Sequence, residues 1–400
     1  MAKSAFLSLT AIASIPLIIT LGNSMLIPVL PVIEKQLSIS PFQSSLIISV
    51  YSIVAALFIP VAGLVSDRVG RKKVIIPSLA ISGAGGLLCG LAAVFSANSF
   101  YLILFGRFIQ GLGAAGAFPL VLPLVADVFT SEEEISHGLG VTETANTVGK
   151  ALSPILGTLL ASLIWYLPFF TIPILASASL LMIALWTDSS KAKTTSMTLT
   201  NFAKNLSDVM KTEGKWLTAV FSSGIIIMIV LFGLLVYLSN VLENPHGIFG
   251  VKKGLLLAIP VSTISLASYL SGRLIGKNKT TMRRTTLVGL SLVAGASLTM
   301  VFFRSLWFLL TLNAIAGFGI GISLPSLDAI LTESVEKEQR GTITSLYSGM
   351  RYAGVAIGPP LFSLLQQLSV EAIFIAACAL SLVAVLLVFL LIRPPQTTLS

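Results

Sequence analysis

Hydrophobic and polar positions along this chain alternate in long blocks, not with the short period of an amphipathic helix or strand. Apolar runs almost free of charge are separated by short segments that carry Lys, Arg, Asp, Ser and Gly. A helix needs about 20 residues to cross about 30 Å of hydrocarbon. Twelve runs reach that length, so the pattern predicts twelve transmembrane helices. They lie at about 6–31, 43–65, 74–95, 100–128, 136–160, 164–186, 216–240, 253–275, 284–303, 306–330, 341–365 and 369–392.

The twelve runs fall into two groups of six, separated by a polar stretch rich in Ser, Thr, Lys and Asn. This division predicts an amino-terminal six-helix bundle at 1–187, a cytoplasmic linker at 188–215 and a carboxy-terminal six-helix bundle at 216–400. Within the linker, residues 199–210 have enough amphipathic character for a helix lying on the membrane surface. A plain flexible linker is the alternative.

The two groups of runs also repeat one another, with an offset of about 206 residues. The repeated positions are Gly111, Gly113 and Pro119 with Gly317, Gly319 and Pro325; Gly70, Arg71 and Lys73 with Gly276, Lys277 and Lys279; and Gly149 and Pro154 with Gly354 and Pro359. Three matches in register, in helices of matching order, indicate duplication of a six-helix unit. Secondary transporters use such repeats to build two rigid halves around a midplane site.

Composition agrees with a membrane protein. Only 10% of the residues are charged, 55% are hydrophobic and the mean hydropathy is +0.96, whereas soluble domains average about 25% charged residues. The net charge of +9 does not indicate nucleic-acid binding, because the cations sit in alternate loops and form no continuous patch. The two cysteines lie in separate apolar runs without metal-like spacing, so no disulfide framework, zinc site or other cofactor is expected.

The distribution of cations predicts the orientation of the helices. Eighteen of the 25 Lys and Arg residues lie on the side of Asp67, while the opposite side holds only Lys35, Lys252, Lys253 and Arg304. Because Lys and Arg favour the cytoplasmic side, both termini are expected in the cytoplasm. The first apolar run is longer than a signal-peptide core and is expected to be retained. Size and short loops suit a multi-pass protein of a bacterial cytoplasmic membrane.

The loop after the second apolar run carries the most specific pattern in the chain. The positive-inside rule accounts for its cations but not for its carboxylate or its spaced glycines. Its marked residues are Gly63, Asp67, Arg68, Gly70, Arg71, Lys72 and Lys73. This pattern closely resembles the signature between the second and third helices of major facilitator superfamily transporters.

The resemblance implies an all-α membrane protein with two pseudo-symmetric six-helix bundles. Within the superfamily the chain looks most like the twelve-helix drug:proton antiporters of bacteria. It implies a monomeric secondary transporter that exports a small amphiphilic molecule by alternating access, driven by inward proton movement. Its partners would then be the substrate, protons and the bilayer. An importer, or a lipid or glycolipid flippase on the same fold, is the alternative.

Arg107 lies within the fourth apolar run, where it must face the protein interior or water and find a partner. Together with Gln110, Gly111 and Gly113, it resembles the family motif Arg-x-x-Gln-Gly-x-Gly, whose arginine is thought to take part in proton coupling in proton-coupled members. The alternative is a structural arginine bonded to carbonyls and hydroxyls. Arg351, in the eleventh run, raises the same question of a partner.

Glu143 and Lys150 lie seven residues apart in the fifth run, hence on one helical face about 10 Å apart. Burial disfavours a charged carboxylate and a nearby cation favours it. Glu143 is therefore the first candidate for proton coupling. The alternative is a fixed ion pair with Lys150 or Arg107 that only holds the bundle together.

The charges expected in the interior bear on the cargo. Three cations, Arg107, Lys150 and Arg351, face one acid, Glu143, which leaves a surplus of about two positive charges. The first run offers only Asn23 before its outer end. Since an unpaired buried charge is costly until a ligand neutralises it, a positive cavity favours anionic or polyphenolic cargo such as a siderophore.

Two further groups complete the candidate site. Gly149, Ser153, Pro154 and Gly157 resemble the helix motif of exporters, although Ser153 and Thr158 replace two of its glycines. Asp127 closes the fourth run and is interpreted as an inner-gate residue that pairs with loop cations including Arg71. A surface carboxylate at a helix end is the alternative.

The chain does not look like an enzyme. A membrane-embedded enzyme would need a histidine–metal cluster or a nucleophile–base pair at midplane. The two histidines, His137 and His246, sit at helix ends on opposite sides of the membrane, and the chain has no phosphate-binding Gly-rich loop with Lys-Ser or Lys-Thr.

Overall fold

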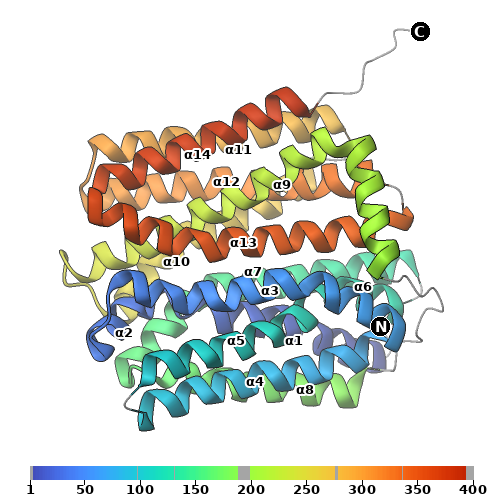
Figure 1. Cartoon of the computed structure of the whole chain (residues 1–400), viewed down its shortest axis with the longest axis horizontal. Coiled ribbons are helices and arrows are strands. Elements are labelled where there is room, and N and C mark those ends of the chain that lie inside the picture. The colour runs from blue at the N-terminus through green and yellow to red at the C-terminus, as the bar shows by residue number, and fades with distance from the viewer. Residues whose placement is uncertain are drawn as a thin grey trace. The chain divides into compact units, whose positions relative to one another are not determined.

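The structure is a computed structural model that describes residues 3–96, 98–129, 131–187, 199–274, 278–335 and 337–392. Within these ranges every regular element is a helix (Figure 1). The first half contains α1 (Lys3–Ser24), η1 (Ile27–Val29), α2 (Leu30–Leu37), α3 (Pro41–Val69), α4 (Arg71–Phe95), α5 (Ser99–Ala117), η2 (Phe118–Leu120), α6 (Val121–Val128), α7 (Glu132–Leu163) and α8 (Leu167–Trp186). The second half contains α9 (Leu199–Glu243), α10 (Gly250–Leu274), α11 (Lys279–Phe302), α12 (Leu306–Ser334), α13 (Lys337–Leu368) and α14 (Val370–Leu391).

These elements match the twelve expected spans one for one. The first and fourth spans are each interrupted by a short 3-10 turn, at η1 and η2, and each turn contains a proline, Pro28 or Pro119. Proline lacks the backbone N–H that an α-helix uses at that position, so the helix narrows there and then resumes.

Ten helices of the described residues are long and apolar enough to cross a membrane by composition. The two long helices outside that set, α7 and α13, have 32 residues each but contain more polar and charged positions. They are the helices that carry Glu143 and Arg351. The all-α, twelve-helix expectation is therefore confirmed, and its two least apolar members are where candidate chemistry lies.

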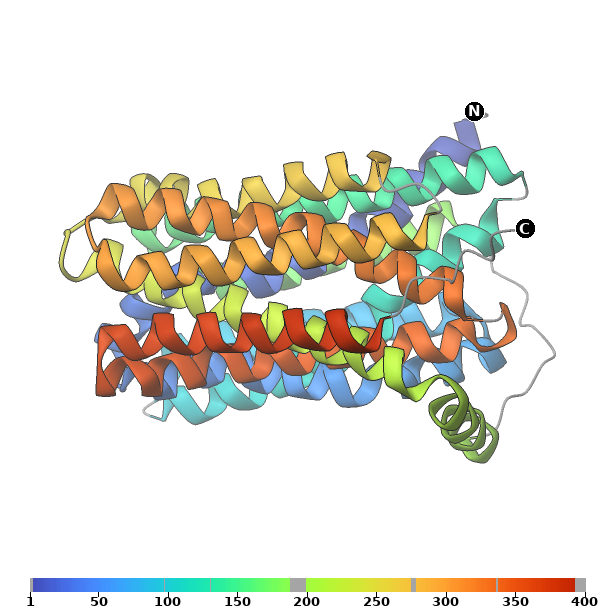
Figure 2. The same ribbon diagram turned by 90° about the horizontal axis from the view of Figure 1, so that it is seen from above.

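Contacts divide the chain into two compact units. One comprises Met1–Leu199 together with Ser239–Ala258, and the other Thr200–Leu238 together with Ile259–Ser400. The division therefore passes through the continuous helices α9 and α10. Part of the expected linker, 188–198, lies outside the described residues. Residues 199–210 are helical, not a flexible linker, and Figure 2 shows that α9 changes direction after its first turns. Its location on a membrane surface stays a prediction.

Within each unit, small residues let helix backbones meet. A Cβ at Gly113 of α5 would clash with the carbonyl of Ser78 in α4, and one at Gly319 of α12 with the carbonyl of Gly289 in α11. In hydrocarbon, helices associate through such close packing because burial from water gives little driving force. The repeated glycines of α5 and α12, and of α7 and α13, are thus packing positions.

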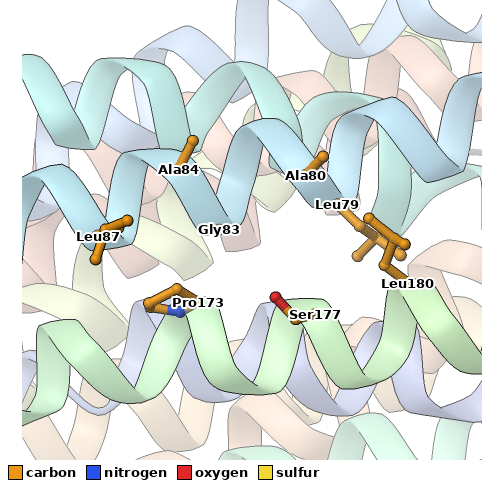
Figure 3. Close-up of a pocket in the computed structure, with 8 residues that line it drawn as sticks. All are labelled: Leu79, Ala80, Gly83, Ala84, Leu87, Pro173, Ser177 and Leu180. Carbon is orange, nitrogen blue, oxygen red and sulfur yellow. The ribbon is translucent and has the colours of Figure 1, made fainter.

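A shallow groove runs between α4 and α8 in the first unit (Figure 3). Apolar or small side chains line it, apart from Ser177. None of the candidate site residues borders this groove, so it adds nothing to the site described next.

Candidate functional site

Arg107 is fully buried in the first unit and links three helices. Its Nε donates to the carbonyl of Ile47 in α3 (2.8 Å), Nη1 to Oε1 of Gln110 (2.6 Å) and Nη2 to Oδ1 of Asn23 in α1 (2.5 Å). Its guanidinium lies 4.3 Å from the ring centroid of Tyr51. The hydrogen bonds described for this cation all go to uncharged oxygens, as the structural alternative expects. Participation in proton coupling stays a prediction.

Glu143 occupies a different environment from the one expected. Its side chain lies on an exposed face of α7, where both carboxylate oxygens accept from Nδ2 of Asn146 (3.2 and 3.4 Å). Asn146 in turn accepts a hydrogen bond from Thr20 of α1 (2.7 Å). The expectation of a buried Glu143 is therefore wrong for this conformation, because the buried face of α7 contains the positions one residue earlier and three residues later.

The hydrogen bonds described for the Glu143 carboxylate go to Asn146, so an ion pair with Lys150 or Arg107 stays a prediction. Lys150 is half-buried two turns farther along α7, and Arg107 directs its three donor groups to Asn23, Ile47 and Gln110. The structure thus brings Asn23 and Arg107 together.

The exporter-like residues of α7 determine how this helix meets α1. A Cβ at Gly149 would come within 3.0 Å of the carbonyl oxygen of Leu17, and one at Gly157 would clash with the carbonyl of Met25. Ser153 is fully buried between them and donates to the carbonyl of Gly149 (2.6 Å). Pro154 lies inside the helix. This face is therefore a packing surface between α7 and α1.

The loop between α3 and α4 forms an ion cluster around Arg71. Arg71 pairs with Asp67 one turn earlier, and its Nε lies 3.6 Å from Oδ2 of Asp127 at the end of α6. Gly70 joins the two helices with φ of +100°, a conformation that side chains other than glycine rarely adopt. The expected contact between Asp127 and Arg71 is thus confirmed, whereas its function as a gate stays a prediction.

The other loop residues have different environments. Lys72 donates to the carbonyls of Ala184 (2.9 Å) and Thr187 (2.5 Å) at the end of α8. Arg68 has an exposed side chain, and a Cβ at Gly63 would meet open space. Of the two spaced glycines, Gly70 is therefore explained by backbone geometry, and no steric reason for Gly63 is seen.

In the second unit, Arg351 has an acidic neighbour that sequence reasoning missed. Its Nη1 lies 3.7 Å from Oδ1 of Asp328 in α12, and its guanidinium lies 5.7 Å from the ring centroid of Tyr347. Tyr347 is buried and stacks against Phe221 of α9. The expected count of interior charges omitted Asp328, an isolated carboxylate in the tenth apolar run, and included Glu143, which is exposed. Three cations, Arg107, Lys150 and Arg351, against Asp328 still leave a surplus of about two positive charges.

A second omission concerns Lys253. The sequence assigned it to the loops, but its side chain is only 2% exposed and pairs with Glu243 at 2.7 Å. The signal was available, since Lys253 begins an apolar run ten residues after Glu243, which lies just beyond the end of the preceding run.

No three His, Cys, Asp or Glu side chains in the part of the chain that the structure describes are grouped to hold a metal ion. The two cysteines are free and buried.

Comparison with known proteins places this architecture in a family. The family model described as Major Facilitator Superfamily matches residues 12–303 and 253–400. The chain is 45% identical to the Bacillibactin exporter of Bacillus subtilis over 382 residues, which cover 95% of each chain. It is 27% identical to Multidrug resistance protein 2 of the same organism over 366 residues, covering 89% of this chain and 88% of that one.

Solved structures show the same fold at low sequence identity. A bacterial homologue of the human lysosomal transporter Spinster, in an inward-facing and occupied conformation, aligns with a TM-score of 0.76 and 16% identity over 96% of this chain and 95% of its own. The human organic anion transporter MFSD10 aligns with a TM-score of 0.73 and 18% identity over 96% and 99%. The chain therefore belongs to the major facilitator superfamily of membrane transporters.

Proposed function

We propose that this transporter exports a siderophore of the bacillibactin kind across the cytoplasmic membrane, in exchange for protons, by alternating access. The observation that carries the proposal is the 45% identity to a bacillibactin exporter along 95% of both chains. Drug efflux is the second candidate, supported by the 27% identity to Multidrug resistance protein 2.

Charge in the helices supports an anionic cargo. Lys150 and Arg351 are half-buried on the two polar helices, α7 and α13. Arg351 shares its charge with Asp328 across 3.7 Å, and the two side chains are 26% and 48% exposed. A loose pair of this kind gives an anionic ligand access to the guanidinium, because the ligand can replace the carboxylate without leaving a buried charge unpaired.

Glu143 is the proposed proton-coupling residue. Its carboxylate is accessible, and its described partner is a neutral amide, Asn146, which can remain in contact with either protonation state. Asn146 is bonded to α1, so a change at Glu143 is transmitted directly to a neighbouring helix. The excess of Lys and Arg on the Asp67 side supports cytoplasmic termini, and we propose that the protein acts as a monomer.

The test is transport by the purified protein in proteoliposomes. An imposed pH gradient should drive movement of bacillibactin toward the acidic side, and a protonophore should reduce it to the level of empty vesicles. Ethidium, a cationic dye, should move more slowly under the same gradient. Bacillibactin movement that ignores the gradient would overturn proton coupling, and faster transport of ethidium would favour drug efflux.

Glu143→Gln sharpens the test. This variant should lose gradient-driven transport while retaining exchange of labelled for unlabelled cargo, because it removes the titrating group without changing its size. Glu133→Gln is the matched control, since Glu133 is an exposed glutamate near the start of the same helix. Wild-type coupling in Glu143→Gln would remove Glu143 from the mechanism.

A further inference from the structure

Four charged side chains meet at the end of α3 that lies away from the Arg71 ion pairs. Nζ of Lys253 in α10 lies 2.7 Å from Oε2 of Glu243 in α9 and donates to the carbonyl of Pro28 (2.7 Å). The other carboxylate oxygen of Glu243 accepts from Nζ of Lys35 in α2 (2.9 Å). Glu34, beside Lys35, accepts from Ser44 of α3 (2.5 Å). Two acids and two bases thus balance one another.

Because the cluster is buried, removing only one of its members is costly. The side chains of Glu243 and Lys253 are each 2% exposed, whereas Lys35 is 54% exposed at the rim. Removing one partner of a buried pair leaves the other charge without compensation, which destabilises a closed structure strongly. The cluster is therefore favourable only while all its members stay together.

The residues of this cluster correspond between the two copies of the duplicated unit. Glu34 corresponds to Glu243 and Ser44 to Lys253, each pair being 209 residues apart in the sequence. The same offset relates Tyr51 to Pro260, whose carbonyls approach the equivalent glycines of α5 and α12. The acid–base pair of the second copy thus meets the acid–hydroxyl pair of the first.

The cluster fastens a hairpin to the first unit. Residues Ser239–Ala258, at the end of α9 and the start of α10, have their contacts in that unit, whereas the remainder of both helices belongs to the other. A Cβ at Gly254 would come within 2.7 Å of the carbonyl oxygen of Pro154, and Ser239 donates to the carbonyl of Ile27 (3.5 Å). The hairpin is continuous with the remainder of α9 and α10. If its contacts with the first unit were broken, the hairpin could therefore move with those helices and stay folded.

We propose that Glu34, Lys35, Glu243 and Lys253 form a latch that holds the α9–α10 hairpin closed against the first unit, and that this latch opens once in each transport cycle. Ser44 and Asp67 lie 23 residues apart on α3, or about 35 Å, so the latch and the Arg71 ion pairs close opposite ends. The proposal rests on alternating access, the mechanism of the proposed function.

The experiment measures access to the hairpin interface. Ser239→Cys places a thiol at a fully buried position in this interface. The variant protein, in nanodiscs, is exposed to a membrane-impermeant maleimide, and the labelled peptides are quantified by mass spectrometry. Native Cys89, which is fully buried in the first unit, reports whether the fold is intact. Adding Glu243→Gln or Lys253→Met should increase the labelling rate at position 239 at least about fivefold, with Cys89 still protected.

Arg304→Gln is the matched control, because it breaks an exposed ion pair with Glu371 at helix ends of the second unit. Labelling unchanged by the latch variants, or raised equally by Arg304→Gln, would overturn the proposal. If a buried variant also exposes Cys89, Lys35→Gln at the half-exposed rim decides: faster labelling of position 239 supports the latch, and an unchanged rate refutes it. The measurement uses no cargo or proton gradient, so its failure is distinct from failure of the proposed export.

Discussion

The two halves of this transporter retain the same packing positions but have diverged in chemistry. A Cβ at Gly111 of α5 would lie 2.5 Å from the carbonyl oxygen of Tyr51, and one at the equivalent Gly317 of α12 would lie 2.6 Å from that of Pro260. Close backbone contact depends on the absence of a side chain, so both copies have kept glycine. Polar residues are under no such common constraint.

Arg107 and Asn313 illustrate the divergence, since they are 206 residues apart at the same place in the repeat. Arg107 bonds to oxygens on α1, α3 and its own helix. Asn313 is equally buried but donates only one turn back, to the carbonyl of Leu309 (2.8 Å). A polar residue thus ties three helices together in the first half, and the corresponding residue in the second satisfies itself locally.

The contacts of α7 and α13 differ in another way. In the first half, Gly157 of α7 lies against Met25 of α1, whereas in the second, Phe362 of α13 packs on Gly233 of α9. The glycine is on α7 in the first half but on α9 in the second. A larger side chain would therefore meet a backbone carbonyl at Gly157 and an aromatic ring at Gly233.

The largest expected effect comes from breaking these two contacts. Gly157→Ala and Gly233→Ala should each lower the midpoint of thermal unfolding in detergent, since overpacking costs about 1–3 kcal/mol or more. In a Phe362→Ala background, Gly233→Ala should cost little further stability, because the obstructing ring is absent. Met25→Ala should not rescue Gly157→Ala, because the carbonyl remains. Rescue in both halves would show that the two contacts are equivalent.

Removal of the buried polar groups should have the next largest effect. Arg107→Met leaves the oxygens of Asn23, Gln110 and Ile47 without their donor, at about 1–3 kcal/mol for each unsatisfied group. We expect more than about a tenfold loss of transport, or 1.4 kcal/mol or more, whereas Asn313→Leu should stay within about threefold.

Arg107→Lys separates charge from geometry, because an ammonium keeps the charge but lacks the planar fork of donors. Its transport rate should fall close to that of Arg107→Met. Equal losses in Arg107→Met and Asn313→Leu would contradict the divergence of the halves.

The smallest effect concerns cargo preference. Lys150→Ala in the first half and Arg351→Ala in the second should each slow bacillibactin transport about threefold to tenfold, or 0.7–1.4 kcal/mol, and slow ethidium less. Asp328→Asn should increase bacillibactin transport, because it frees Arg351 from its acidic neighbour. Initial rates in proteoliposomes measure these changes. Equal losses of bacillibactin and ethidium transport would contradict the proposal that the transport path prefers anionic cargo.

Much of the fold could be predicted from the sequence. Run length identified all twelve spans, since the thickness of the bilayer sets the length of an apolar helix. The repeated Gly and Pro positions revealed the duplication, because close backbone contact needs a missing side chain. The contact between Asp127 and Arg71 was also foreseen, from the position of Asp127 at the end of the fourth run.

Tertiary structure decided which way each side chain faces and what it meets. Glu143 is exposed, whereas Asn146, three residues later on α7, is buried and accepts from Thr20 of α1. Arg351 meets Asp328, and Lys253 is buried against Glu243, because helices distant in sequence are packed side by side. Hydropathy determines which segments enter a membrane, but the rotation of a helix about its axis follows from its neighbours. The partners of the buried charges are therefore properties of the packed structure alone.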